Sequence, residues 1–119
     1  MLEGIAFEMR LNLDVLSQYG VKINEAVASG GGSVSSKWLQ IKSDITGLTI
    51  SSLITNEGGL LGLAVIQAVH ARLFIDYESA IKAYRKIKEV HHPNLEAQEL
   101  YEKPYSKYRK LYQTLKEFE

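Results

Sequence analysis

Residues 28–33, which are Ala-Ser-Gly-Gly-Gly-Ser, decide how this chain is interpreted. They follow a short apolar run in residues 25–29 that predicts a buried strand, and they precede a predicted helix at about residues 37–46 with Gly47 as its stop. Glycines lack a Cβ atom, so a phosphate or a nucleotide can approach the backbone of such a loop. The free N–H groups and the dipole of the following helix favour an anion there. A flexible glycine turn explains the same residues equally well.

Two common phosphate-binding motifs do not fit this loop. A Walker loop requires Gly-Lys-Ser/Thr, whereas Lys37 lies beyond the serines. The dinucleotide fingerprint requires three spaced glycines and an acidic residue after the second strand. Here Ser35 occupies the place of the third glycine, and the second strand ends in Ile54-Thr55-Asn56. Ser35 or Ser36 is instead a candidate cap for the helix that follows.

The rest of the chain alternates helices with few strands. Residues 2–19 predict a helix that is apolar on several faces and therefore lies between two layers, and residues 48–54 predict a second strand. Residues 58–73 predict a deeply buried helix preceded by a cap at 55–57. Asp76 caps a helix at 77–87, residues 91–94 form a turn, and a helix at 95–119 is broken or kinked at Pro104. A sheet of two strands is only marginally stable by itself, so this α/β chain is expected to be the end of a larger domain.

Composition excludes several classes of protein. The 119 residues suit one small domain, and the net charge of +0 gives no electrostatic footprint for nucleic acid or for an anionic membrane. Absence of cysteine excludes disulfides and thiolate metal sites and suits a reducing cytoplasm. The N-terminus does not have the pattern of a signal peptide. The run Leu60 to Val69 is about half as long as a membrane-spanning helix must be.

Several residues of chemically active types are best explained by structural roles. The carboxylates Asp14, Asp44 and Asp76 are expected to cap helices or to be solvated, and no catalytic residue is assigned. His91 and His92 are adjacent and lack a carboxylate cluster, so no metal site is predicted. Packing is the expected role of the remaining candidates, which are Trp38, His70 and the stripe Tyr101, Tyr105, Tyr108, Tyr112 and Leu115.

The chain resembles the C-terminal region of the FGGY carbohydrate kinases, and of the xylulokinases among them most closely. The resemblance covers essentially the whole chain in the right order. Four groups of residues carry it: residues 2–7 (Leu-Glu-Gly-Ile-Ala-Phe) with Arg10; residues 28–33 with Ser35, Trp38, Gln40, Asp44 and Gly47; Glu57-Gly58 with Leu61, Gly62 and Ala64; and the terminal tyrosines Tyr101, Tyr105, Tyr108 and Tyr112 with Leu111.

This resemblance implies part of an actin-like (ribonuclease H-like) ATPase fold across residues 1–119. In that family two such domains close on ATP and Mg²⁺, and an aspartate of the other domain deprotonates the sugar hydroxyl. Carried over by position, the residues that contact the nucleotide are Gly30, Gly31, Gly32, Ser33 and Ser35. The domain with the sugar site and the base lies outside this chain, as do the first strands of its own domain and their phosphate loop.

The expected function is therefore the nucleotide-binding portion of a cytoplasmic, ATP-dependent sugar kinase that phosphorylates a ketopentose such as xylulose. The chain is expected to be a domain or truncated product, inactive alone and self-associating through uncovered strand edges or through the tyrosine stripe. Two alternatives stay open. One is a non-enzymatic actin-like remnant that binds a partner or nucleotide, and the other is a helical self-association module.

Overall fold

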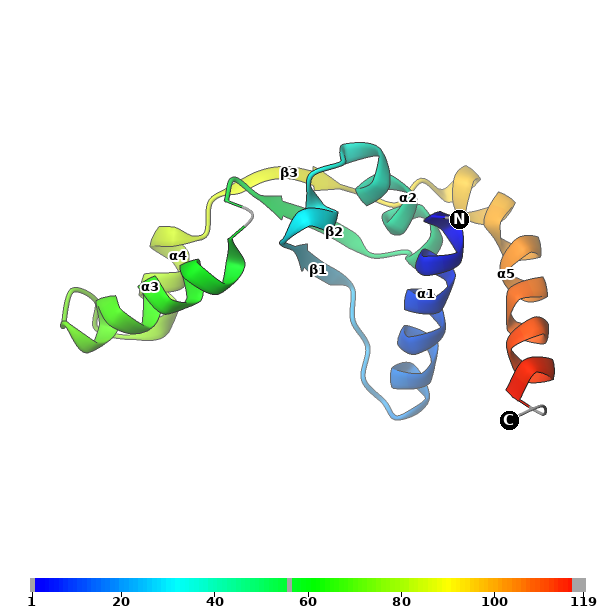
Figure 1. The fold of residues 1–119 in the computed structure, drawn as a ribbon, viewed down its shortest axis with the longest axis horizontal. Helices are drawn as coiled ribbons and strands as arrows, with labels where there is room; N and C mark the ends of the chain where they lie inside the picture. The colour runs from blue at the N-terminus through cyan, green and yellow to red at the C-terminus, as the bar shows by residue number, and fades with distance from the viewer. Residues whose placement is uncertain (1, 56, 117–119) are drawn as a thin grey trace.

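The computed structural model describes residues 2–55 and 57–116, which form an α/β arrangement of five α-helices and a three-stranded sheet (Figure 1). The α/β fold class is therefore confirmed. In chain order the elements are α1 (Leu2–Gln18), β1 (Glu25–Ala28), the 3-10 turn η1 (Gly31–Ser33), α2 (Ser36–Thr46), β2 (Thr49–Leu53), α3 (Gly58–His70), α4 (Tyr77–Tyr84), β3 (Ile87–His91) and α5 (Leu95–Lys116). Among the described residues, no helix is both long and apolar enough to span a membrane.

The sheet has the strand order β1-β2-β3. β1 and β2 are parallel, with Ala26 opposite Ile50, and β2 and β3 are antiparallel, with Ser51 opposite Val90. The expectation of two strands was wrong, because residues 87–91 form β3 where the sequence predicted the end of a helix and a turn. α4 ends at Tyr84, and the backbone N–H of Ile54 donates to the Lys86 carbonyl at 2.9 Å. Pairing with β2 thus overrides the weak strand propensity of a segment that contains lysine and glutamate.

The predicted burial of β1 was also wrong. β1 lies at an edge of the sheet, and the Val27 residue is 48% exposed. The helix α1 contacts α2 and α5, but Val15 and Leu16 are exposed, so α1 is not enclosed between two layers. Both deviations leave apolar side chains exposed.

One side of the sheet is covered by α1 and α2 (Figure 1). A core of Leu39, Leu48 and Ile50 lies there, with Met9 and Leu13 of α1 packed against it. The helix α2 has the boundaries that its sequence predicts: the Ser35 hydroxyl accepts from the Trp38 N–H at 3.3 Å, and Gly47 ends the helix in the left-handed conformation at φ 74°. The start of α2 is thereby fixed directly after the glycine loop.

Three residues of the predicted packing stripe on α5 pack against α1, whereas the fifth residue of the stripe, Leu115, is 58% exposed. Tyr101, Tyr105 and Tyr108 surround Phe7 at ring-centroid distances of 6.2, 5.9 and 5.6 Å. The Tyr105 hydroxyl donates to Asp14, and burial together with this carboxylate raises the pKa of Tyr105 above its ordinary value. The helix continues through Pro104, so the predicted break is absent. The Tyr112 side chain and residues 117–119 lie outside the described part of the chain.

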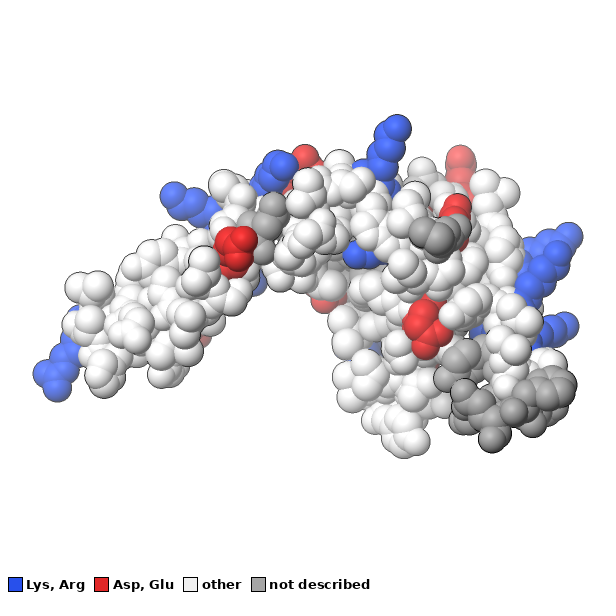
Figure 2. All heavy atoms as spheres, in the orientation of Figure 1, with Lys and Arg blue, Asp and Glu red and all other residues white. Residues whose placement is uncertain are grey.

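The helices α3 and α4 pack on each other and extend away from the sheet (Figure 1). The predicted deep burial of α3 was wrong, because Leu60 is 63% and Leu63 is 58% exposed, and His70 is exposed too. We call α3 and α4 together the α3–α4 arm. Figure 2 shows few charged atoms on the visible face of this arm. The N-cap residue of α3 is Glu57, and it makes no side-chain cap hydrogen bond. The Thr55 hydroxyl accepts from the Glu57 N–H at 3.3 Å, and Asn56 lies outside the described residues. An apolar helix exposed in this way needs a cover.

Candidate nucleotide site

The glycine loop connects β1 to α2 at the carboxyl end of the parallel strand pair. Gly30 has φ 79° and ψ −172°, a conformation that side chains disfavour, and it turns the chain out of the sheet. Gly31 and Gly32 are exposed. A Cβ atom added to Gly30 or Gly31 would meet nothing within 4 Å. The backbone of this loop is therefore open to a ligand.

The hydroxyls of Ser33 and Ser35, the two serines of the predicted site, form hydrogen bonds within the loop and at the start of α2. Ser33 is only 6% exposed, and its hydroxyl donates to the Gly30 carbonyl at 2.7 Å, next to the backbone bond from the Ser33 N–H to the same oxygen at 3.0 Å. The Ser35 hydroxyl caps α2. The hydroxyls thus hold the loop and the helix start in place, which leaves the exposed glycine backbone as the surface for a ligand.

The start of α3 lies against the other side of the loop. A Cβ atom added to Gly58 would be 3.0 Å from the Ser29 Oγ, so a larger residue here would require the Ser29 side chain to move by a few tenths of an ångström. Consequently α2 and α3 both begin at the carboxyl ends of β1 and β2. Ligands of parallel α/β sheets bind at this end of the strands, and two helix N-termini favour negative charge there. The sequence did not predict this contact, since only the glycine itself signals it.

Lys42 provides a positive charge beside the loop. Its Nζ lies 4.7 Å from the centre of the Trp38 ring and would lie 3.8 Å from a Cβ atom at Gly32. Burial lowers the pKa of Lys42. Lys42 and Gly32 line a hollow of about 280 Å³ together with residues of α1, β1 and β2. Lysine one turn before the end of an amphipathic helix carries no signal by itself, so the sequence did not identify it.

The three aspartates all accept hydrogen bonds within the fold, but only Asp76 has the simple helix cap that was predicted for it. The Asp44 carboxylate accepts from the Gln40 side chain at 2.8 Å and from the Asn94 N–H at 2.9 Å, and it joins α2 to the start of α5. Asp76 accepts from the Ser79 N–H at 2.7 Å, and hydrogen bonding from the side chain and then the backbone of Ser79 lowers the pKa of Asp76. Asp14 holds Tyr105. These carboxylates are thus engaged away from the glycine loop.

The His91 and Trp38 side chains both have contacts within the fold. His91 Nδ1 lies 3.3 Å from Gln40 Oε1, and His91 Nε2 lies 3.3 Å from Glu89 Oε2. Trp38 packs against the core formed by Ala6, Phe7, Ile45 and Tyr105. Within residues 2–55 and 57–116, no three histidine or acidic residues are grouped closely enough to hold a metal ion. The expectation that the chain has no metal site stays a prediction.

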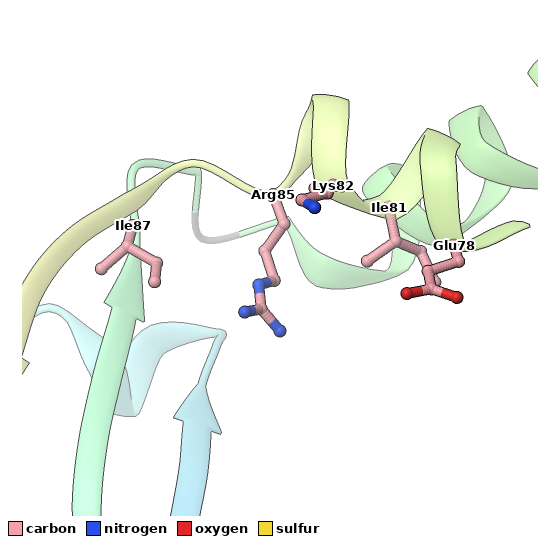
Figure 3. Close-up of a pocket in the computed structure, with 5 residues that line it drawn as sticks. All are labelled: Glu78, Ile81, Lys82, Arg85 and Ile87. Carbon is pink, nitrogen blue, oxygen red and sulfur yellow. The ribbon is translucent and has the colours of Figure 1, made fainter. Parts of the chain in front are cut away.

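A second hollow, of about 310 Å³, lies beside α4 and the start of β3 (Figure 3). Its lining residues are Glu78, Ile81, Lys82, Arg85 and Ile87. Figure 3 shows the Arg85 side chain extending from the end of α4 toward the open space beyond the strands. It combines charges of both signs with apolar side chains, and the glycine loop does not contribute to it, so it is not the candidate nucleotide site.

Comparison of the chain with models of known protein families assigns it to a class of protein. The model for "FGGY family of carbohydrate kinases, C-terminal domain" matches residues 1–71. The chain belongs to this family, as its motifs predicted.

Individual relatives agree with this assignment. A xylulose kinase of Staphylococcus epidermidis is 33% identical over 98% of this chain and 24% of its own length. An autoinducer-2 kinase of Klebsiella pneumoniae is also 33% identical, over 92% of this chain and 21% of its own length. The chain therefore spans about a quarter of the length of the curated relatives it matches.

Solved structures confirm the fold. The xylulose kinase of Rhodospirillum rubrum superposes with a TM-score of 0.82 at 26% identity, over 98% of this chain and 24% of that enzyme. The gluconate kinase of Lactobacillus acidophilus superposes with a TM-score of 0.84 at 21% identity, over 96% of this chain and 23% of that enzyme. The segment thus has the conformation that equivalent segments have inside larger actin-like kinases.

Proposed function

We propose that residues 1–119 form the nucleotide-binding portion of an ATP-dependent sugar kinase. The observation that carries this proposal is the open backbone of Gly30, Gly31 and Gly32 at the carboxyl ends of two parallel strands, between the starts of α2 and α3. Ser33 and Ser35 would support the site by holding the loop rather than through free hydroxyls. The loop backbone would contact the phosphate and ribose side of ATP, with Lys42 adding a nearby charge.

The reaction of the intact kinase would move the γ-phosphoryl group of ATP to a hydroxyl of a sugar. Two of the relatives above are named xylulose kinases, so a ketopentose such as xylulose is the proposed substrate class. The described residues offer no cluster of acidic ligands, so Mg²⁺ would not be held by this chain alone. Phosphoryl transfer depends on positioning and charge stabilisation from several sides. We therefore propose that the chain is inactive by itself.

ATP binding at the glycine loop provides the direct test. Half of a cleft buries little of a ligand, so we expect a dissociation constant on the order of 1 mM. In a titration followed by amide chemical shifts, the largest changes should fall on Gly30 to Ser35. Gly31→Val should weaken binding at least about tenfold, or ~1.4 kcal/mol, because its side chain would project into the space that the nucleotide needs.

The same experiment has a matched control. A Cβ atom at Gly4 on α1 also meets nothing within 4 Å, so Gly4→Val adds the same side chain without crowding and should leave the affinity unchanged. Shifts that centre on another region, or that persist in Gly31→Val, would move the nucleotide site away from this loop.

Self-association is a further proposal for the isolated chain. Light scattering at micromolar concentration should show dimers or larger species, because Leu60 and Leu63 expose large apolar side chains on α3. Each such side chain contributes roughly 1.5–3 kcal/mol when fully buried. Leu63→Glu should shift the population toward monomer, whereas the control Leu111→Glu on the exposed side of α5 should not. A clean monomer with one cooperative thermal transition would contradict this proposal, and an effect confined to Leu111→Glu would favour the tyrosine-bearing helix.

The remaining proposals concern partners and location. The balanced charge supports a chain that binds neither nucleic acid nor an anionic membrane surface, and absence of cysteine supports the cytoplasm. The exposed arm also suits the second candidate, a nucleotide-binding remnant without chemistry. ATP binding with no turnover, even after the missing kinase parts are added, would favour that candidate.

A further inference from the structure

Lys42 carries a positive charge that no acidic residue in the described part of the chain balances. In residues 2–55 and 57–116 the ion pairs join Arg10 to Glu102 and His91 to Glu89, and neither includes Lys42. The Lys42 side chain is partly buried, and this burial lowers the pKa of Lys42. A cation that is partly removed from water and has no counter-charge favours the approach of an anion.

The ammonium group of Lys42 lies at the glycine loop, although its backbone lies further along α2. Side chains of an α-helix lean toward the N-terminus, and residues four positions apart share a face. Lys42 accordingly extends over Trp38, with Nζ 4.7 Å from the centre of that ring, and Nζ would lie 3.8 Å from a Cβ atom on Gly32. Because Trp38 itself packs against a buried core, the charge has a defined place beside the loop.

The surroundings of this charge strengthen its electrostatic effect. Among the described residues that line the hollow of about 280 Å³, Lys42 is the only charged one, and the apolar residues Met9 and Ile50 lie there too. Charges interact more strongly beside apolar surface than in open water. Lys37, on the first turn of α2, is by contrast exposed, so water and salt screen its charge. The two lysines therefore differ in how strongly they can act on a ligand of the loop.

We propose that Lys42 determines which ligands the glycine loop prefers: its ammonium group contacts the phosphate chain of a bound nucleotide, and the affinity rises with each phosphate that the ligand carries. An ammonium group attracts every further negative charge, whereas the backbone N–H groups of the loop can hold the first phosphate of any nucleotide alike. This inference rests on the proposed nucleotide site, and it adds the side chain that selects a triphosphate over a monophosphate.

The first test compares AMP, ADP and ATP on the unaltered chain, in buffer without divalent cations so that the phosphates keep their full charge. Titrations followed by the amide shifts of Gly30 to Ser35 give the dissociation constants. We expect ATP to bind at least about tenfold more tightly than AMP. The signal of the side-chain carbon next to Nζ reports the protonation of Lys42. ATP should raise the pKa of Lys42 more than AMP does, because phosphate favours the charged form.

Three variants separate Lys42 from general effects of charge. Lys42→Met removes the charge and keeps an unbranched side chain, so the affinity for ATP should fall at least about fivefold while that for AMP changes less than about twofold. Lys42→Arg keeps the charge and should keep the preference for ATP. Lys37→Met removes an exposed charge from the same helix and should change neither affinity by more than about twofold.

The outcomes distinguish the role of Lys42 from the nucleotide site itself. Loop shifts with ATP in the wild-type chain, together with an unchanged preference for ATP in Lys42→Met, would overturn the role of Lys42 and leave the nucleotide site in place. Equal losses in Lys37→Met and Lys42→Met would overturn it too, because the preference would then come from the overall charge of α2. If Lys42→Met does not fold, a pKa of Lys42 that ATP leaves unchanged in the wild-type chain would overturn it. Shifts outside the loop would remove the site and this inference together.

Discussion

Phosphorylation of xylulose by this chain alone should be indistinguishable from a blank without enzyme. The chain supplies one glycine loop and the starts of α2 and α3, whereas phosphoryl transfer needs a base and groups that stabilise charge around the phosphate. Enzymes of this type turn over roughly 1–100 times per second, so a coupled assay of ADP release covers many orders of magnitude between an active and an inactive protein.

The intact Staphylococcus epidermidis xylulose kinase, assayed at the same molar concentration, is the positive control for this experiment. The chain covers 24% of that enzyme. Measurable turnover by the isolated chain that saturates with xylulose would show that one wall of the cleft suffices, and the proposal of inactivity would fail. Turnover that appears only when the remaining part of that kinase is added would agree with the proposed nucleotide site.

The sequence allowed the family and the central part of the fold to be predicted, because local signals there agree with the tertiary structure. The glycines after β1, the Ser35 cap and the Gly47 stop determine where α2 begins and ends, and each acts over only a few residues. The tyrosine stripe predicted the packing of α5 because its spacing repeats over three helical turns and faces Phe7.

Other features depend on contacts that no local pattern contains. β3 exists because residues 87–91 pair with β2, which is far away in sequence. The exposure of α3 was not predictable either. An apolar helix is normally buried, but in this chain α3 packs mainly on α4. The apolar pattern of α3 predicted deep burial, and this prediction was wrong for the described part of the chain.

The candidate site likewise contains some features that the sequence predicted and others that it did not. Its glycine loop was predicted, since glycine clusters between a strand and a helix have a known physical use. The proximity of Lys42 and of Gly58 to the loop was not, because it results from how α2 and α3 are placed around the strand ends. The hydrogen bond from the Ser33 hydroxyl to the Gly30 carbonyl was not predicted either, and the contact of Ser33 with a nucleotide stays a prediction.

Phe7→Ala should be among the most destabilising single substitutions in this chain. Phe7 is buried, and its ring contacts three tyrosines of α5 and so joins α1 to α5. Removal of a buried phenylalanine side chain costs about 3–5 kcal/mol, a large part of the ~5–15 kcal/mol that stabilises a typical domain. Chemical denaturation followed by the fluorescence of Trp38, which packs against the same cluster, gives the change in the free energy of unfolding.

Phe74→Ala is the matched control, because Phe74 also contacts a tyrosine ring, that of Tyr84 at 5.6 Å, but lies partly exposed on the α3–α4 arm. We expect it to cost no more than about 1–2 kcal/mol, since less apolar surface is lost and the cavity opens to water. In Phe7→Ala the amides of α5 should also lose their protection from hydrogen exchange, while in Phe74→Ala they should keep it. Equal losses of stability in the two variants would contradict this account, because α5 would then be held by Arg10–Glu102 and the Tyr105–Asp14 bond rather than by the aromatic cluster.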